Sequence, residues 1–276
     1  MRLPLSKALA TTAVALTALC MDAGARYAQA ADFSTTEIQY QFGRLDVPSF
    51  AGGGTDSTSI VTLQHASGYK WGDVFFFIDF LHGQRGDQTH FNDDDTYGEL
   101  YINFSSSKLL GINYGKGLLR DIGLIQGLNA GADANVYKYL PGIRFSWNIP
   151  GFAFFNTDFM AYLDFSRGVK PGTFNAPAET DSAMLDVNFA APFMIGGQHF
   201  SFEGHIEFVA PRKNEFGDRV AGHIFGQPQL RWDVGYALTG HKDKFFIGTE
   251  YQIWVNKLGD KRTDESAFQA LAVWRF

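Results

Sequence analysis

Long runs of alternating apolar and polar residues are the feature that most limits how this chain can fold. Residues 71–80 read WGDVFFFIDF, in which one aspartate precedes and one follows three consecutive phenylalanines. Successive side chains of a β-strand point to opposite faces. Odd positions from Trp71 to Asp79 therefore combine carboxylates with aromatic rings, whereas even positions are uncharged and mostly apolar. This pattern predicts a strand with lipid on one face and a wet lumen on the other.

The same division recurs in four later segments, at 152–165, 182–191, 198–209 and 244–255. Runs of this length match what a strand needs to cross a membrane at a tilt. The sequence predicts an all-β fold, a 12-stranded antiparallel transmembrane β-barrel of the Gram-negative outer membrane, with no further domain boundary. The expected strands are 36–45, 57–68, 71–82, 97–106, 108–117, 134–148, 151–165, 181–191, 198–209, 223–236, 244–255 and 265–276.

The connections between these strands are expected to alternate in length. Long polar segments follow the odd-numbered strands and short turns follow the even-numbered ones. Outer-membrane barrels have long outer loops and short periplasmic turns. Residues 117–133 fit this scheme least, because Leu118, Ile122, Ile125 and Leu128 recur at near-helical spacing. We expect a loop there, either packed on the rim or holding a short helix that enters the pore.

The first 30 residues have the composition of a secretory signal. Arg2 and Lys7 precede an apolar run over 8–20, and Ala28-Gln29-Ala30 offers a signal-peptidase site. We expect cleavage after Ala30 and a barrel over 31–276. Cys20 is the only cysteine and lies inside the signal, so the mature chain should form no disulfides. A lipid-modified Cys20 is the alternative, although the bulky Leu19 disfavours it.

The C-terminal segment carries a further indication of the destination. Phe268, Ala270, Ala272, Trp274 and Phe276 share one strand face. An aromatic terminus of this kind resembles the sorting signal read by the outer-membrane assembly machinery, which we expect to bind Trp274 and Phe276. Outer-membrane lipid and lipopolysaccharide would surround the barrel. The net charge of −6 and the lack of a basic patch argue against nucleic acid as a partner.

The motif Trp71-x-Asp73-x-x-x-Phe77-x-Asp79, preceded by TLQHASGYK, resembles the nucleoside-specific outer-membrane channels of the Tsx type. The resemblance implies a monomeric twelve-stranded barrel that passes nucleosides through a narrow lumen. The segment ADFSTTEIQYQFG, which would begin the mature chain, differs from the tryptophan-rich opening of the best-known members.

The predicted lumen faces combine acids with aromatic rings. An aromatic ring can stack on a nucleobase for about 1–3 kcal/mol. Carboxylates can accept hydrogen bonds from ribose hydroxyls and repel phosphorylated analogues. Alternatively, the lumen acids pair with bases such as Arg144 and Arg231 and merely fill the barrel. No catalytic residue, cofactor or metal is expected. The candidate solute-binding residues are Asp73, Phe75, Phe77, Asp79, Glu99, Tyr101, Glu203, Glu207, Glu250 and Trp254.

Two other functions remain open at this point. His65-Ala66-Ser67 places a histidine and a serine on one strand face, as in twelve-stranded outer-membrane phospholipases, where a histidine activates a serine nucleophile. Gly68 stands where that family has asparagine. The second alternative is a surface or receptor barrel without transport. Asp93–Asp95 matches no calcium loop and is expected to lie in a solvated outer loop.

Overall fold

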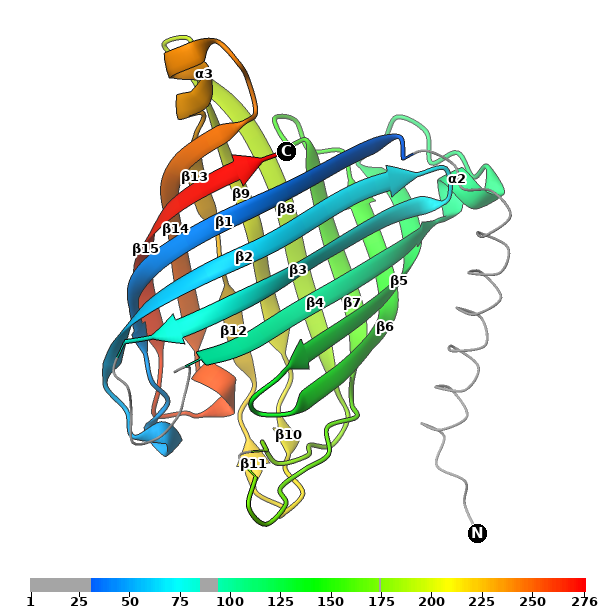
Figure 1. The fold of residues 1–276 in the computed structure, drawn as a ribbon. Helices are drawn as coiled ribbons and strands as arrows, with labels where there is room; N and C mark the ends of the chain where they lie inside the picture. Colours follow the sequence, from blue (N-terminus) through cyan, green and yellow to red (C-terminus); the bar gives the residue numbers. More distant parts are fainter. Residues whose placement is uncertain (1–30, 85–93, 174) are drawn as a thin grey trace.

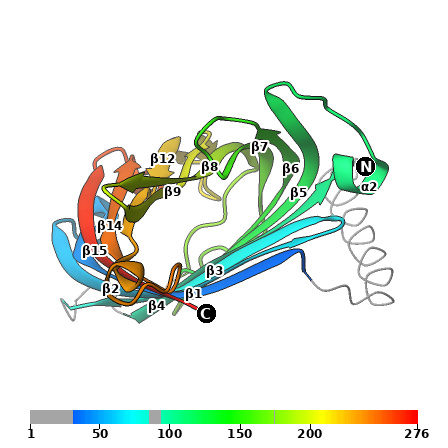
Figure 2. The same ribbon diagram turned by 90° about the horizontal axis from the view of Figure 1, so that it is seen from above.

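The computed structural model describes residues 31–84, 94–173 and 175–276, and the predicted signal peptide lies outside them. One antiparallel sheet curls round until its first and last strands meet (Figures 1 and 2). Among the described residues, no helix is long and apolar enough to cross a membrane. The main strands are β1 (Phe33–Asp46), β2 (Thr55–Tyr69), β3 (Gly72–Gly83), β4 (Asp94–Ser105), β5 (Leu119–Gly131), β6 (Val136–Trp147), β7 (Phe154–Asp164), β8 (Ser182–Ile195), β9 (Gln198–Val209), β12 (His223–Gly226), β13 (Gln229–Trp232), β14 (Phe245–Val255) and β15 (Glu265–Arg275).

These thirteen segments form a barrel wall of twelve strands, because β12 and β13 share one strand position. β12 and β13 both pair with β9 and β14, and the register is the same before and after Gln227 and Pro228. Proline has no backbone N–H to give to a ladder, so the strand is interrupted there and then continues. The sheet closes through pairing of β15 with both β1 and β14. The predicted 12-stranded antiparallel transmembrane β-barrel is therefore confirmed.

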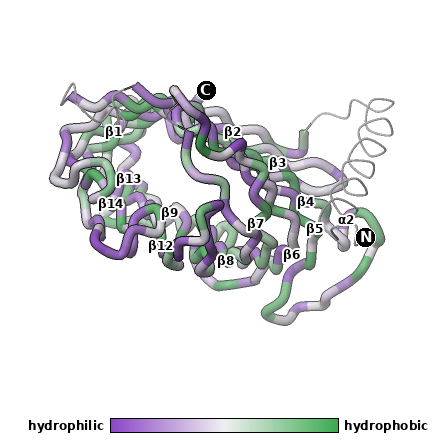
Figure 3. Tube along the Cα trace, turned by 90° about the horizontal axis from the view of Figure 1, so that it is seen from below, coloured by the Kyte–Doolittle hydropathy of each residue, from purple (hydrophilic) through white to green (hydrophobic). Residues whose placement is uncertain are grey.

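The two faces of the wall follow the predicted parity. Along β9, Phe202, Ile206 and Phe208 are exposed on the outside, whereas Glu207 and Val209 are buried inside. β14 repeats the arrangement, with Ile247 exposed and Glu250 buried. Hydrophilic and hydrophobic residues alternate along much of the wall (Figure 3). An apolar exterior around a polar interior is the inverse of a water-soluble fold and suits lipid surroundings.

The two rims of the barrel differ in their connections. The long-loop end carries 47–54, 165–181, 210–222 and 256–264, and within 210–222 the short strands β10 (Arg212–Lys213) and β11 (Arg219–Val220) form a hairpin. The short-turn end carries 70–71 and 196–197, together with α2 (Ser106–Leu110) and α3 (Val234–Thr239). The C-terminus lies at this second end (Figure 1).

The expected alternation of loop lengths is wrong around β5. Connection 106–118 at the short-turn end is long, whereas 132–135 at the opposite end has four residues. The expected strand over 108–117 does not exist, because α2 and an irregular segment occupy it, and the expected loop over 117–133 contains β5. The inward positions of β5 include Gly123 and Gly127. Because glycine has no side chain, the inward face of β5 shows few of the polar residues that would reveal a strand by alternation.

Two smaller predictions also fail. Trp71 was assigned to the lumen face but precedes β3, and its ring stacks on Tyr69 with centroids 5.0 Å apart and lies 5.5 Å from Phe104. These two neighbours come from outward positions, so Trp71 lies at the outer rim. The strand expected over 223–236 ends at Trp232, since the side chain of Asp233 accepts a hydrogen bond from the Tyr236 amide and caps α3.

Candidate functional site in the barrel lumen

Inward side chains form rows across β6 to β9, because pairing places one inward residue of each strand opposite the next. One row runs from Arg144 through Asp158 and Asp186 to Glu207. The neighbouring row toward the long-loop end is apolar and consists of Met160, Met184 and Val209. With Ile125 and Leu140 it forms a buried cluster against which Tyr101 and Tyr162 pack. The lumen therefore has a charged belt beside an apolar belt.

Arg144 is the main cation of the charged belt. Its Nε and Nη2 donate to the two carboxylate oxygens of Asp158 at 2.8 and 2.7 Å. Its Nη1 donates to Asp73 Oδ1 at 3.0 Å, although β4 and β5 lie between their strands. Asn103 donates to the other oxygen of Asp73 at 2.8 Å. Asp73 thus belongs to a structural ion pair, in line with the alternative that lumen acids pair with bases and fill the barrel.

A second ion-pair network closes the wall where β1 meets β15. Arg231 donates to Glu37 at 3.0 Å and contacts Glu203 at 2.5 Å, and Arg275 pairs with the same Glu37 carboxylate at 2.5 Å. Arg231 and Glu37 are each only 2% exposed. Charges buried this deeply require partners, since an isolated one would ionise at great cost. Glu203 therefore also has a structural partner.

A third network lies near the long-loop end, above the apolar belt. Lys138 contacts Glu179 at 2.7 Å and Asp164 at 3.1 Å, and Arg212 donates to the same Glu179 at 2.6 Å. The Lys138 and Arg212 cations lie 5.2 and 5.3 Å from the centre of the Tyr162 ring. Segment 165–181 supplies Glu179, so a loop of the long-loop end is held to the barrel interior by ion pairs.

Four of the predicted acids have no basic partner among the described residues: Asp79, Glu99, Glu207 and Glu250. Asp79 accepts from Thr62 at 2.6 Å. Glu99 accepts from the Tyr97 hydroxyl at 2.6 Å and from Asn129 at 2.8 Å. One oxygen of Glu207, Oε2, is buried without a hydrogen-bond partner.

Glu250 accepts instead from an amide network on β13 to β15. Gln229 donates to it at 2.6 Å, Gln269 at 2.7 Å and Gln227 at 3.2 Å. Gln39 on β1 accepts from Gln229 at 3.1 Å. These glutamines are not among the predicted solute-binding residues, although strand parity places Gln39, Gln229 and Gln269 on the lumen face.

The paired strands β3 and β4 form a part of the lumen wall that carries both aromatic rings and carboxylates. The register places Phe77 opposite Glu99, Asp79 opposite Tyr97 and Phe75 opposite Tyr101. The Phe77 ring lies 6.2 Å from Phe75 and 6.1 Å from Tyr97 between centroids, in tilted arrangements. Phe75 and Phe77 are half-buried. The structure therefore brings together most of the residues predicted from the 71–80 motif.

Trp254 lies apart from this wall, on β14. Its ring tilts against Phe225 at a centroid distance of 4.4 Å, and Lys257 Nζ lies 5.3 Å from its centre. The indole nitrogen is buried without a hydrogen-bond partner. Trp254 is thus part of the packing between β12 and the outer loop that follows β14.

His65 and Ser67 do face outward together, as expected for the phospholipase alternative. However, His65 Nδ1 bonds to the Thr36 hydroxyl at 2.8 Å and the ring stacks on Phe76 at 5.3 Å. Ser67 donates to the Tyr69 hydroxyl at 3.2 Å. The geometry does not provide the histidine–serine hydrogen bond that would activate the serine.

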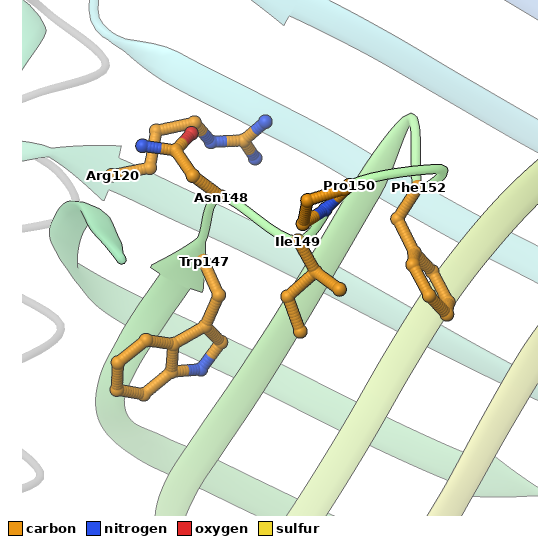
Figure 4. A pocket seen from close by; sticks show the side chains of 6 residues that line it. All are labelled: Arg120, Trp147, Asn148, Ile149, Pro150 and Phe152. Carbon is orange, nitrogen blue, oxygen red and sulfur yellow. The ribbon is translucent and has the colours of Figure 1, made fainter. Parts of the chain in front are cut away.

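Two hollows lie toward the short-turn end. One of about 430 Å³ is lined by Glu203, Phe246, Arg275, His199 and Asp243, among others. Figure 4 shows the other, a recess of about 270 Å³ lined by Arg120, Trp147, Asn148, Ile149, Pro150 and Phe152. It lies around the turn between β6 and β7, outside the predicted solute-binding set. The first hollow includes Glu203 and the buried ring of Phe246, so a predicted site residue lines it.

No protein-family model matches the chain, and no curated protein matches it. Solved structures with a similar course include the NanC porin, at 11% identity and a TM-score of 0.48 over 86% of this chain and 98% of that one. The KdgM porin has 9% identity and a TM-score of 0.44 over 87% and 99%. The toluene transporter TodX of Pseudomonas putida has 8% identity and a TM-score of 0.35 over 89% of each chain. Similarity at this level indicates neither a solute nor a mechanism for this chain.

Proposed function

We propose that this chain is an outer-membrane channel that admits small neutral polar solutes, nucleosides in particular, and rejects their phosphorylated analogues. The observation that carries the proposal is the β3–β4 wall. There Phe77 lies opposite Glu99 and Asp79 lies opposite Tyr97, so that these two rings each have a carboxylate beside them on the paired strand. A nucleoside has a flat base and vicinal hydroxyls, and this wall can offer stacking to the first and hydrogen-bond acceptors to the second.

Charge supports the selection against anions. Asp79, Glu99, Glu207 and Glu250 pair with no basic residue among those that the structure describes, whereas Asp73 and Glu203 pair with arginines. In their ionised forms, these four acids have no paired cation among the described residues to neutralise them. A phosphate entering the lumen would meet like charge, and a ribose hydroxyl would meet acceptors. Because each contact is modest, a solute can also leave again.

A second candidate is a sealed barrel that serves as a surface structure or receptor. The buried interior near β1 and β13 to β15 favours it. Gln39 is 1% exposed and Gln269 is fully buried, which indicates a densely filled lumen on that side. Both candidates share the topology proposed here, with the long-loop end outside and the short-turn end in the periplasm.

The experiment is competitive uptake of a nucleoside, its free base and its nucleotide by liposomes that contain the purified barrel. We expect saturable nucleoside uptake and little nucleotide uptake. Phe77→Ala should weaken nucleoside binding by about 1–3 kcal/mol through lost stacking. Asp79→Asn should keep the Thr62 contact but relax the rejection of the nucleotide, because the repelling charge is gone.

The matched control is Phe76→Ala, which removes a neighbouring ring of the same strand from the outward face. It should leave solute selection unchanged. Equal flux of all three solutes through the unmutated barrel would indicate a nonspecific pore. Absence of flux would favour the sealed barrel.

A further inference from the structure

Two carboxylates lie opposite each other inside the barrel, and one of them has no ion-pair partner among the described residues. Asp186 on β8 is directly opposite Glu207 on β9, and Asp158 on β7 is opposite Asp186 on its other side. Like charges directly opposite in a sheet destabilise it. Arg144 is the guanidinium of this row, and its bidentate contact is with Asp158. Asp186 pairs with His205 at 3.2 Å, whereas Glu207 forms no ion pair among the described residues.

Burial makes this lack of a partner costly for Glu207. Its side chain is 8% exposed, and the buried oxygen Oε2 has no hydrogen-bond partner. Leaving a buried carboxylate oxygen unpaired costs more than leaving a neutral group unpaired. The arrangement is explained if a cation belongs between Asp186 and Glu207.

His205 supplies the third donor. It lies two residues from Glu207 on the inward face of β9, and its Nδ1 lies 3.2 Å from Asp186 Oδ1. One ligand atom from each of Asp186, His205 and Glu207 lies within 4.8 Å of the other two. Two ligands of a tetrahedral zinc ion are separated by about 3.3 Å, given bond lengths near 2.0–2.1 Å. The observed His205–Asp186 separation fits two ligands of one ion.

We propose that Asp186, His205 and Glu207 bind a divalent transition-metal ion of the Zn²⁺ class in the lumen. One imidazole with two carboxylates suits Zn²⁺ and its neighbours in the first transition row, whereas Mg²⁺ and Ca²⁺ prefer all-oxygen sites. Glu207 brings to this site a buried carboxylate oxygen that has no hydrogen-bond partner. Such a site would depart from the expectation that the chain binds no metal.

Neighbouring side chains orient two of the three ligands. Asn188 donates to Asp186 Oδ2 at 2.7 Å, which leaves Oδ1 turned toward His205. The His205 ring packs edge-on against Phe225, with centroids 5.6 Å apart and planes at 82°. Such outer contacts fix ligand orientation in metal sites. Three protein ligands leave the fourth position of a tetrahedral ion to a water molecule.

The test is isothermal titration of Zn²⁺ into the full barrel in detergent micelles, purified without a histidine tag and treated with a chelator. We expect one binding site. His205→Ala and Glu207→Gln should each weaken binding at least tenfold, by loss of a ligand. The matched control is His65→Ala, because this outward histidine contacts the Thr36 hydroxyl and the Phe76 ring and is not one of the three ligands. It should bind Zn²⁺ like the unmutated protein.

A second measurement separates loss of a ligand from loss of the fold. Zn²⁺ should raise the thermal unfolding midpoint of the unmutated barrel. Without metal, Glu207→Gln should be at least as stable as the parent, because it removes one member of a like-charge pair, but Zn²⁺ should no longer raise its midpoint. Absence of Zn²⁺ binding to the parent, or unchanged binding in both ligand variants, would overturn the site. Neither result depends on whether the barrel transports nucleosides.

Discussion

At the scale of single residues, ion pairing with arginine separates the lumen acids into two groups. Asp73, Asp158 and Glu203 contact arginines and contribute to the integrity of the barrel. Asp79 and Glu207 have no such partner among the described residues, so they are better placed to contact a solute or an ion. Strand parity treats these residues alike, because it reports the face of the sheet and not the neighbour across the lumen.

Removal of Arg144 should be strongly destabilising. Arg144→Met leaves Asp158 and Asp73 without their guanidinium, and breaking a buried pair from one side costs about 3–5 kcal/mol. The Arg144 side chain is 9% exposed and that of Asp158 is 1% exposed. The measurement is urea-induced unfolding of the barrel in lipid vesicles, followed by tryptophan fluorescence.

The control for this prediction is Arg262→Met. Arg262 pairs with Asp260 at 3.4 Å and its side chain is 74% exposed. Exposed pairs contribute about 0–1 kcal/mol, so this variant should unfold close to the parent. Equal unfolding midpoints for both variants would contradict a structural role for Arg144.

At the scale of elements, β5 explains how a strand can escape detection. Its inward positions include Gly123, Ile125 and Gly127, where the barrel interior is occupied by side chains from other strands. A Cβ placed on Gly127 would lie 2.6 Å from the Tyr101 ring and 2.9 Å from Leu140 Cβ. The space that a polar lumen residue would fill is thus already taken by β4 and β6.

Gly127 should tolerate no larger side chain. Gly127→Ala forces the Tyr101 ring or the Leu140 side chain to move, and overpacking of this kind costs about 1–3 kcal/mol. Ala130→Leu is the control, since Ala130 is exposed on the outer face of the same strand. Urea unfolding in vesicles should separate the two variants. If Ala130→Leu is as damaging as Gly127→Ala, the assigned faces of β5 are wrong.

At the scale of the whole molecule, closure of the sheet gives the two rims their separate identities. Arg275 and Glu37 join β15 to β1 inside, and Lys257 contacts Glu265 at 2.6 Å near the long-loop end. Trp274 and Phe276, expected to bind the assembly machinery, are exposed at the short-turn end. A closed barrel has no free strand edge, which is what a membrane interior requires.

The proposed topology can be tested with single cysteines, because the only native cysteine lies in the expected signal peptide. Lys170→Cys at the long-loop end should react with a membrane-impermeant reagent in intact cells, and Lys70→Cys at the short-turn end should not. Both positions are exposed. The folded protein should also migrate faster on gels unheated than boiled. Labelling of both cysteines, or of neither, would contradict the orientation.

The local alternation of side chains was sufficient to predict the barrel and the inward face of most strands. Each strand from β6 to β9 carries its own polar and apolar halves, so its two environments can be recognised without its neighbours. The odd positions of the 71–80 motif also face the lumen as predicted, apart from Trp71. Only the tertiary structure located β5, because Gly127 is explained by Tyr101 of another strand and not by any residue near it in the chain.

The lumen chemistry depended still more on contacts between distant residues. Nothing in the spacing of Asp73 and Arg144 indicates that they meet across two intervening strands, since closure of the barrel brings them together. The same holds for Asp186 and Glu207, which the register of β8 with β9 places opposite each other. Apart from β5 and Trp71, the sequence alone determined which side chains enter the lumen. The tertiary structure decided which of them neutralise one another and which remain available for a solute or an ion.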